Sequence, residues 1–139
     1  MYYITTEASF DSAHFLYGYE GKCRNIHGHR WRVIITLKSE ELIEDGEYKG
    51  MLIEFGDVKE KLKKETEKLD HSLIIEENSL SERTLNALKE ENFNIITVNF
   101  RPTAENFAKY FYKKMKKYNY TIATAEVYET PNNKAIYGE

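Results

Sequence analysis

An alternating run of apolar and polar residues over positions 27–39 constrains the fold of this chain more than any other feature. Its odd-numbered positions, from His27 to Leu37, carry imidazole or apolar side chains, whereas Arg30 and Arg32 occupy the other side. This period of two predicts a long strand with one buried face. A strand of this kind needs partner strands at its edges and helices over its apolar face.

The rest of the chain supplies candidates for those partners. Strands are expected at 3–14, 51–55, 94–100, 120–129 and 134–137, with 51–55 returning as the hairpin partner of 27–39. Helices are expected at 58–68, after Asp57 as the N-cap, and at 104–118. A further helix is expected to start at Ser79, where Ser79 and Glu82 form a capping box. Together these elements predict an α+β fold, an antiparallel β-sheet with helices packed on one face.

Composition narrows the class of protein. The 139 residues contain no internal repeat or linker, so a single domain over 1–139 is expected. A net charge of −3 argues against a nucleic-acid partner. Apolar residues nowhere run to ten in a row, and the first residues lack the features of a secretory signal. We therefore expect no membrane partner and a cytoplasmic location.

Three histidines are the strongest chemical signal. His27 and His29 are two apart on the long strand and so share one face, and His14 ends the preceding strand. Three imidazoles suit Zn²⁺ and leave a fourth position open for water or substrate. The alternative is three separate histidines, each satisfied by ordinary hydrogen bonds.

Cys23 is the only cysteine, so the chain has no intrachain disulfide. Its neighbours Lys22 and Arg24 would stabilise a thiolate, which favours a reactive group. Cys23 could instead close the zinc site as a fourth, structural ligand, or be a buried neutral thiol.

Acidic groups and a fourth histidine complete the candidates. His71 follows Asp70, a pairing that suits general acid/base chemistry but also the end of a helix. Glu105 is interpreted as an ordinary acidic residue in the first turn of the helix expected at 104–118, where the helix dipole favours it. Glu129 ends a strand beside a turn. Either glutamate could also serve as the base of a zinc hydrolase.

Six short segments occur in one order along most of the chain. They are Phe10–His14, Cys23–His29, Ile53–Asp57, Leu69–His71, Pro102–Asn106 and Glu129–Thr130. This ordered set resembles the family of 6-pyruvoyltetrahydropterin synthase and 6-carboxytetrahydropterin synthase. The stretch 76–98 matches least well.

The resemblance implies a role for each candidate and an assembly. Zinc would be bound by His14, His27 and His29; Cys23 would be the catalytic thiolate, with Asp70 and His71 as the acid/base group. Glu129 would anchor the pterin, with Thr103 and Glu105 supporting its pocket. The implied fold is a four-stranded antiparallel sheet with two helices on one face. Trimers would form a β-barrel, and two stacked trimers a homohexamer with active sites at subunit interfaces.

The spacing of Cys23, His27 and His29 resembles the bacterial carboxytetrahydropterin synthases of queuosine (7-deazapurine) biosynthesis. The implied reaction converts 7,8-dihydroneopterin triphosphate to 6-carboxytetrahydropterin, triphosphate and acetaldehyde. A 6-pyruvoyltetrahydropterin synthase, which eliminates triphosphate, is the alternative within the family. A zinc-stabilised, non-catalytic binding domain is the alternative from another class.

Overall fold

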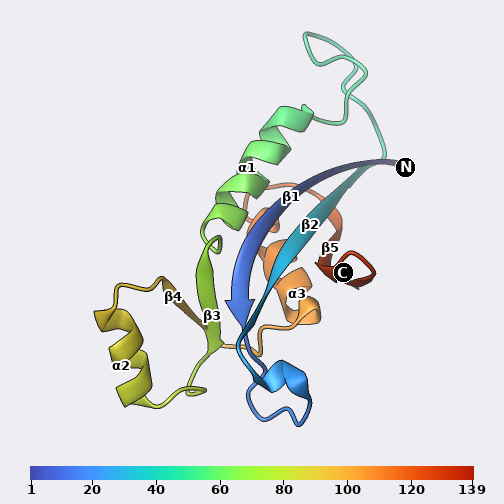
Figure 1. Ribbon diagram of the computed structural model, residues 1–139. Coiled ribbons are helices and arrows are strands. Elements are labelled where there is room, and N and C mark those ends of the chain that lie inside the picture. The colour runs from blue at the N-terminus through green and yellow to red at the C-terminus, as the bar shows by residue number, and fades with distance from the viewer.

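The two longest strands form the centre of the fold. In the computed structural model, which describes all 139 residues, β1 (Tyr2–His14) and β2 (His27–Ser39) pair antiparallel along their full length. The pairing runs from Tyr2 opposite Ser39 to His14 opposite His27. Both strands are long and strongly curved (Figure 1). The expectation for 27–39 is therefore confirmed, and its partner is the strand that precedes it.

Four shorter strands extend the sheet to both sides, in the order β4-β3-β1-β2-β5-β6. β5 (Ile122–Thr130) pairs antiparallel with β2, and β6 (Asn133–Tyr137) pairs antiparallel with β5. On the other side, β3 (Ser72–Glu76) runs parallel to the last three residues of β1, and β4 (Ile95–Val98) runs parallel to β3. The α+β class is confirmed, but the sheet is mixed and not wholly antiparallel.

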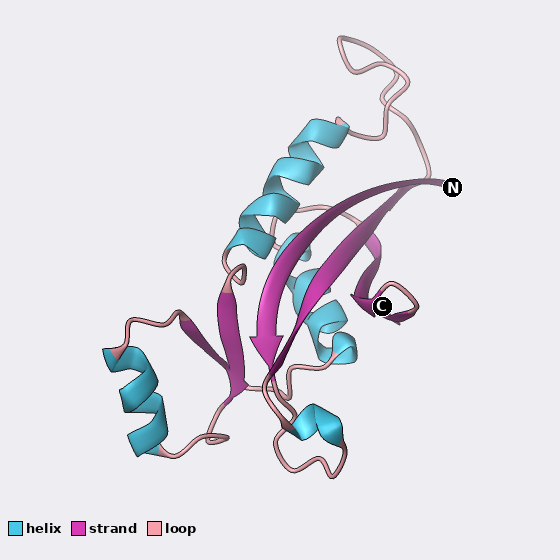
Figure 2. Cartoon of the chain, in the orientation of Figure 1, coloured by secondary structure: helices cyan, strands magenta, loops and turns pink.

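Two of the three α-helices cover one face of the sheet (Figures 1 and 2). α1 (Phe55–Glu67) packs on β1, and α3 (Ala104–Lys116) packs on β5 and β6. α2 (Glu82–Glu90) lies apart with β3 and β4 and buries none of its residues. The core under α3 is aromatic, with the Trp31 ring centroid 4.9 Å from Phe107 and 6.1 Å from Phe10. No helix combines the length and apolar character that crossing a membrane would require.

Three expected elements are corrected. Residues 51–54 are not a strand, because β1 and β5 already occupy both edges of β2. α1 begins at Phe55 after Glu54, so Asp57 lies in its first turn and accepts a hydrogen bond from the Tyr120 hydroxyl at 2.5 Å. α2 starts later than expected, because Ser81 and not Ser79 is its N-cap, accepting from the Thr84 amide at 3.2 Å.

β3 was not anticipated from the sequence. It carries three consecutive apolar residues, Leu73, Ile74 and Ile75, of which the last two are buried. A short strand that is covered on both faces shows no alternation, so its period gives no signal. Its position beside the end of β1 brings the residues that precede it, Asp70 and His71, against that strand.

Candidate metal centre and surrounding groups

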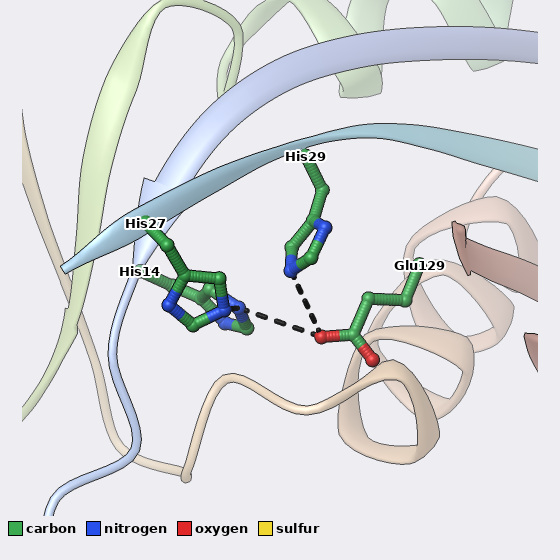
Figure 3. Close-up of side chains that lie close together, drawn as sticks. All are labelled: His14, His27, His29 and Glu129. Carbon is green, nitrogen blue, oxygen red and sulfur yellow. Dashed lines mark hydrogen bonds and ion pairs between the residues drawn. The ribbon is translucent and has the colours of Figure 1, made fainter. Parts of the chain in front are cut away.

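Three imidazoles and one carboxylate converge where β1 ends and β2 begins (Figure 3). The register places His14 opposite His27 and Ser12 opposite His29, so the three rings project from the same face. Glu129, near the end of β5, points toward them. One possible ligand atom from each of the four residues lies within 4.8 Å of the others. These four residues, which together could hold one metal ion, are called the metal cluster.

Main-chain carbonyls orient two of the rings. His14 Nδ1 lies 2.7 Å from the Pro102 carbonyl oxygen, and His27 Nδ1 lies 2.7 Å from that of Asn25. Because a carbonyl oxygen can only accept, each Nδ1 carries the proton and the Nε2 of each neutral ring presents a lone pair. These two Nε2 atoms are 3.1 Å apart. Two facing lone pairs need a cation or an added proton between them.

A tetrahedral metal fits these separations. Zn–N bonds of about 2.0–2.1 Å place ligand atoms roughly 3.3–3.4 Å apart around a tetrahedron. Glu129 Oε1 is 3.1 Å from His29 Nε2 and 3.5 Å from His14 Nε2. His29 Nε2 is buried, and the Glu129 oxygen beside it does not meet hydrogen-bond geometry. An orphaned ring nitrogen among converging lone pairs is the arrangement that a metal ion resolves.

The local electrostatics favour a metal over added protons. Burial lowers the pKa of His29, and the neighbouring His14 and His27 lower it further against the opposing charge of Glu129. The contact with His14 lowers the pKa of the Glu129 carboxyl, although burial acts in the other direction. A lowered pKa favours the neutral form of His29 and the ionised form of Glu129, which are the protonation states that metal binding requires.

Trp31 forms the floor of the histidine cluster. Its ring meets His14 and His29 edge to face, at centroid distances of 5.0 and 5.2 Å. The indole is fully buried, and neither its Nε1 nor the nearby Ser12 hydroxyl has a hydrogen-bond partner. The only tryptophan of the chain therefore lies in direct contact with two of the candidate ligands.

Cys23 lies outside this cluster. It is half-buried in a single 3-10 turn (Lys22–Arg24), where its carbonyl accepts the Leu16 amide at 2.9 Å. Its sulfur is not among the converging ligand atoms, which are three histidine nitrogens and one carboxylate oxygen. The structure thus does not bring Cys23 to the position of a fourth ligand within one protomer.

Asp70 and His71 form a hydrogen-bonded pair beside β1. Asp70 Oδ2 accepts from His71 Nδ1 at 2.7 Å, and this bond raises the pKa of His71. The pKa of Asp70 is lowered, first by the Asp11 amide that donates to it and then by His71. The imidazole is 79% exposed. The pair therefore favours a protonated, accessible imidazole, which suits proton transfer.

A cleft of about 750 Å³ adjoins this pair. Its polar lining includes Asp11, His29, Arg30, His71 and Asn94, and its apolar lining includes Ile26, Leu88 and Phe93. The alternation of β1 and β2 points Asp11 and Arg30 away from the face that carries the metal cluster. Within one protomer, the Asp70–His71 pair and the metal cluster are thus set on opposite sides of the β1–β2 ribbon.

Thr103 and Glu105 lie at the start of α3. Thr103 is the N-cap, and its hydroxyl accepts from the Asn106 amide at 3.3 Å. Glu105 is exposed in the first turn of the helix. Pro102, the residue before Thr103, supplies the carbonyl that orients His14. The N-cap of α3 therefore lies directly beside the metal cluster. The carbonyl contacts could not be predicted from the sequence, since every residue carries the same main-chain carbonyl.

The fold and the cluster together define an α+β protein with a candidate metal centre on one side of the β1–β2 ribbon and a cleft beside the Asp70–His71 pair. Comparison with known proteins makes this specific. The family model described as 6-pyruvoyl tetrahydropterin synthase matches residues 3–139. The chain belongs to the 6-pyruvoyl tetrahydropterin synthase family.

Two curated relatives of this chain carry the same name. The 6-carboxy-5,6,7,8-tetrahydropterin synthase of Haemophilus influenzae is 34% identical, with all of both chains covered. The protein of the same name from Aquifex aeolicus is 34% identical over 85% of this chain and 76% of its own.

Solved structures agree on the fold. An uncharacterized protein from Wolinella succinogenes superposes with a TM-score of 0.76 and 21% identity, covering 99% of this chain and 98% of that one. The 6-pyruvoyl tetrahydropterin synthase of Plasmodium falciparum superposes with a TM-score of 0.73 and 23% identity, covering 99% of this chain and 97% of that one. The α+β fold expected from the resemblance is thereby confirmed, although the sheet has six strands where four were expected.

Proposed function

We propose that this chain is a zinc-dependent 6-carboxy-5,6,7,8-tetrahydropterin synthase that acts in queuosine biosynthesis. Its substrates would be 7,8-dihydroneopterin triphosphate and one molecule of water, and its products 6-carboxytetrahydropterin, triphosphate and acetaldehyde. The observation that carries the proposal is the convergence of three ring nitrogens and a carboxylate in a member of this family. The name shared by the relatives supports the carboxy product.

The metal ligands would be His14, His27 and His29 through their Nε2 atoms. Zinc held there supplies Lewis acidity toward oxygen groups on the side chain of the substrate. The carbonyls of Pro102 and Asn25 keep two of the rings in the required tautomer.

Glu129 would fix the pterin ring. A carboxylate can accept two N–H groups from the amide and amino edge of a pterin, which sets the register of the ring. The lowered pKa of Glu129 supports this role because an acceptor must remain ionised. Thr103 and Glu105 would support the pocket from the start of α3.

Cys23 and the Asp70–His71 pair would move protons. The Cys23 thiolate removes a proton from a side-chain carbon of the substrate, and His71 transfers protons with Asp70 as its partner. Since His71 and the metal cluster lie on opposite sides of β1 and β2, His71 would serve the Cys23 and metal of a neighbouring protomer. Its exposed ring beside a cleft supports this arrangement. The assembly would be a cytoplasmic homohexamer with active sites between subunits.

Product analysis tests the proposal. The purified protein, loaded with zinc, is incubated with 7,8-dihydroneopterin triphosphate, and the products are separated by liquid chromatography and mass spectrometry. We expect 6-carboxytetrahydropterin and acetaldehyde. A pyruvoyl product would instead indicate the other activity of the family, and no turnover would overturn the proposal.

The Cys23→Ala variant separates catalysis from metal binding. We expect it to abolish turnover while the zinc content stays near one per chain, because the sulfur lies outside the ligand cluster. Loss of zinc would make Cys23 a structural ligand. A non-catalytic zinc domain would be indifferent to changes at Cys23 and His71 and would hold four protein ligands without an exchangeable position.

A further inference from the structure

Both members of the Asp70–His71 pair are docked on the main chain of one residue, Asp11 of β1. The Asp11 amide donates to Asp70 Oδ1 at 2.8 Å, and the His71 amide donates to the Asp11 carbonyl at 2.7 Å. The remaining carboxylate oxygen of Asp70 binds the His71 ring at 2.7 Å. Position and orientation of the pair therefore depend on where the backbone of Asp11 lies.

The side chain of Asp11 is clamped in turn by Arg30. The two residues face each other across β1 and β2, and Arg30 donates from Nε to Oδ1 and from Nη2 to Oδ2, both at 3.0 Å. Such two-bond contacts fix the relative orientation of the planar groups as well as their distance.

Stability does not explain this clamp. The Arg30 and Asp11 side chains are 73% and 40% exposed, and ion pairs this accessible to solvent contribute little to folding. Local order at His71 does need support. Its φ of 51° is in the left-handed region that residues other than glycine rarely adopt, and packing does not hold its exposed ring.

We infer that Arg30 and Asp11 are positioning residues for the Asp70–His71 pair, with Arg30 fixing Asp11 and the Asp11 backbone fixing the pair. This inference rests on the proposed proton-transfer role of the pair. Neither residue needs to touch the substrate for the arrangement to act.

The protonation of His71 reports on this positioning. The groups with charge near the ring are Asp70, Asp11 and, beyond it, Arg30. The cleft residues contributed by β3, α2, β4 and the segment before β4 are uncharged: Ser72, Leu73, Leu88, Phe93, Asn94 and Ile95. Since the Asp70 bond is the largest cause of the raised pKa of His71, loosening the pair lowers that pKa.

The sign of the shift separates positioning from simple charge effects. In Arg30→Gln, loss of a nearby positive charge alone would raise the pKa of His71, because Asp11 would be left unopposed. Loss of positioning lowers it. In Arg30→Lys the charge remains and only the two-bond geometry is lost, so positioning again predicts a lower pKa and charge alone predicts no change.

The experiment is an NMR titration of zinc-loaded protein carrying ¹³C-labelled histidine, with the His71 signal assigned from His71→Gln. We expect both Arg30 variants to lower the pKa of His71. An unchanged or raised value in both would overturn the inference. The matched control is Arg32→Gln, since Arg32 forms an ion pair with Glu7 at 2.9 Å on the same face of β1 and β2 without contacting the pair. It should leave the titration unchanged.

Turnover gives the second readout. We expect kcat of Arg30→Lys to fall roughly 10- to 100-fold with KM nearly unchanged, because a displaced proton-transfer group slows the chemical step. If the parent protein shows no turnover, the proposed function fails, whereas the NMR titration still decides whether Arg30 positions His71.

Discussion

At the scale of single residues, the metal cluster is organised by its surroundings before any ion binds. Each carbonyl that holds a ring belongs to a segment outside the sheet, at Pro102 and Asn25. Trp31 closes the space beneath His14 and His29. Rings held in this way lose little freedom when a metal binds, so affinity depends on the ligands themselves.

Trp31 should report directly on metal binding. Adding Co²⁺ to the chelator-treated protein is expected to quench its emission and to saturate at one ion per chain, because a cobalt ion on His14 and His29 would lie next to the indole. Zn²⁺ should then displace the cobalt and restore the emission. Fluorescence titration is the measurement, with His29→Ala expected to lose the effect and His71→Gln to keep it. Equal quenching in His29→Ala would contradict this site.

Glu129 has two possible roles that one substitution separates. Its Oε1 lies where a fourth ligand would bind, 3.1 Å from His29 Nε2, yet the proposed function makes it the anchor of the pterin. We expect Glu129→Gln to keep about one zinc per chain and to raise KM at least tenfold, since a charged hydrogen bond to the substrate becomes a neutral one. Zinc content by elemental analysis and steady-state kinetics test this. Zinc loss would identify Glu129 as a ligand.

At the scale of elements, the parts with a clear period were predictable. β1, β2 and α3 lie close to where alternation or helical spacing placed them, and β1 and β2 bring His14, His27 and His29 together as expected. The errors arise where pairing between segments far apart in the sequence decides whether a segment becomes a strand. The run at 51–55 has strand-like composition, but β2 had no free edge for it.

The same reasoning explains what was missing from the candidate site. Residue types identified the histidines and Glu129, because these side chains have distinctive chemistry. The pairing of Asp11 with Arg30 depends on strand register, and the docking of Asp70 on Asp11 depends on β3, which gave no periodic signal. Contacts of this kind become visible only once the sheet order is known.

The N-cap of α3 links helix stability to the metal cluster. Thr103→Ala should lower the free energy of unfolding by about 1 kcal/mol through loss of the cap. It should also weaken metal binding, because the adjacent Pro102 carbonyl orients His14. Denaturant unfolding and competition with a chelator measure the two effects. Thr103→Ser, which keeps the hydroxyl, is expected to restore both; unchanged metal affinity in Thr103→Ala would separate the cap from the cluster.

At the scale of the whole molecule, one protomer leaves three sheet edges unpaired. β4 and β6 are the two end strands, and because β3 pairs only with residues 12–14 of β1, most of the outer edge of β1 has no partner either. Unpaired edges of this length are sites of association in folded proteins. Assembly through them is a means by which the Asp70–His71 pair of one chain could meet the metal cluster of another.

Mixed assemblies test whether active sites are shared. Cys23→Ala and His71→Gln should each be inactive alone, but co-expressed in equal amounts they should regain about a quarter of the parent activity if each site takes Cys23 from one chain and His71 from its neighbour. The fraction follows from random assembly, since half of the chains supply each intact group. Activity per chain, measured on assemblies whose mass is checked by light scattering, gives the answer. A site built within one chain would recover no activity, because every chain lacks one of the two groups.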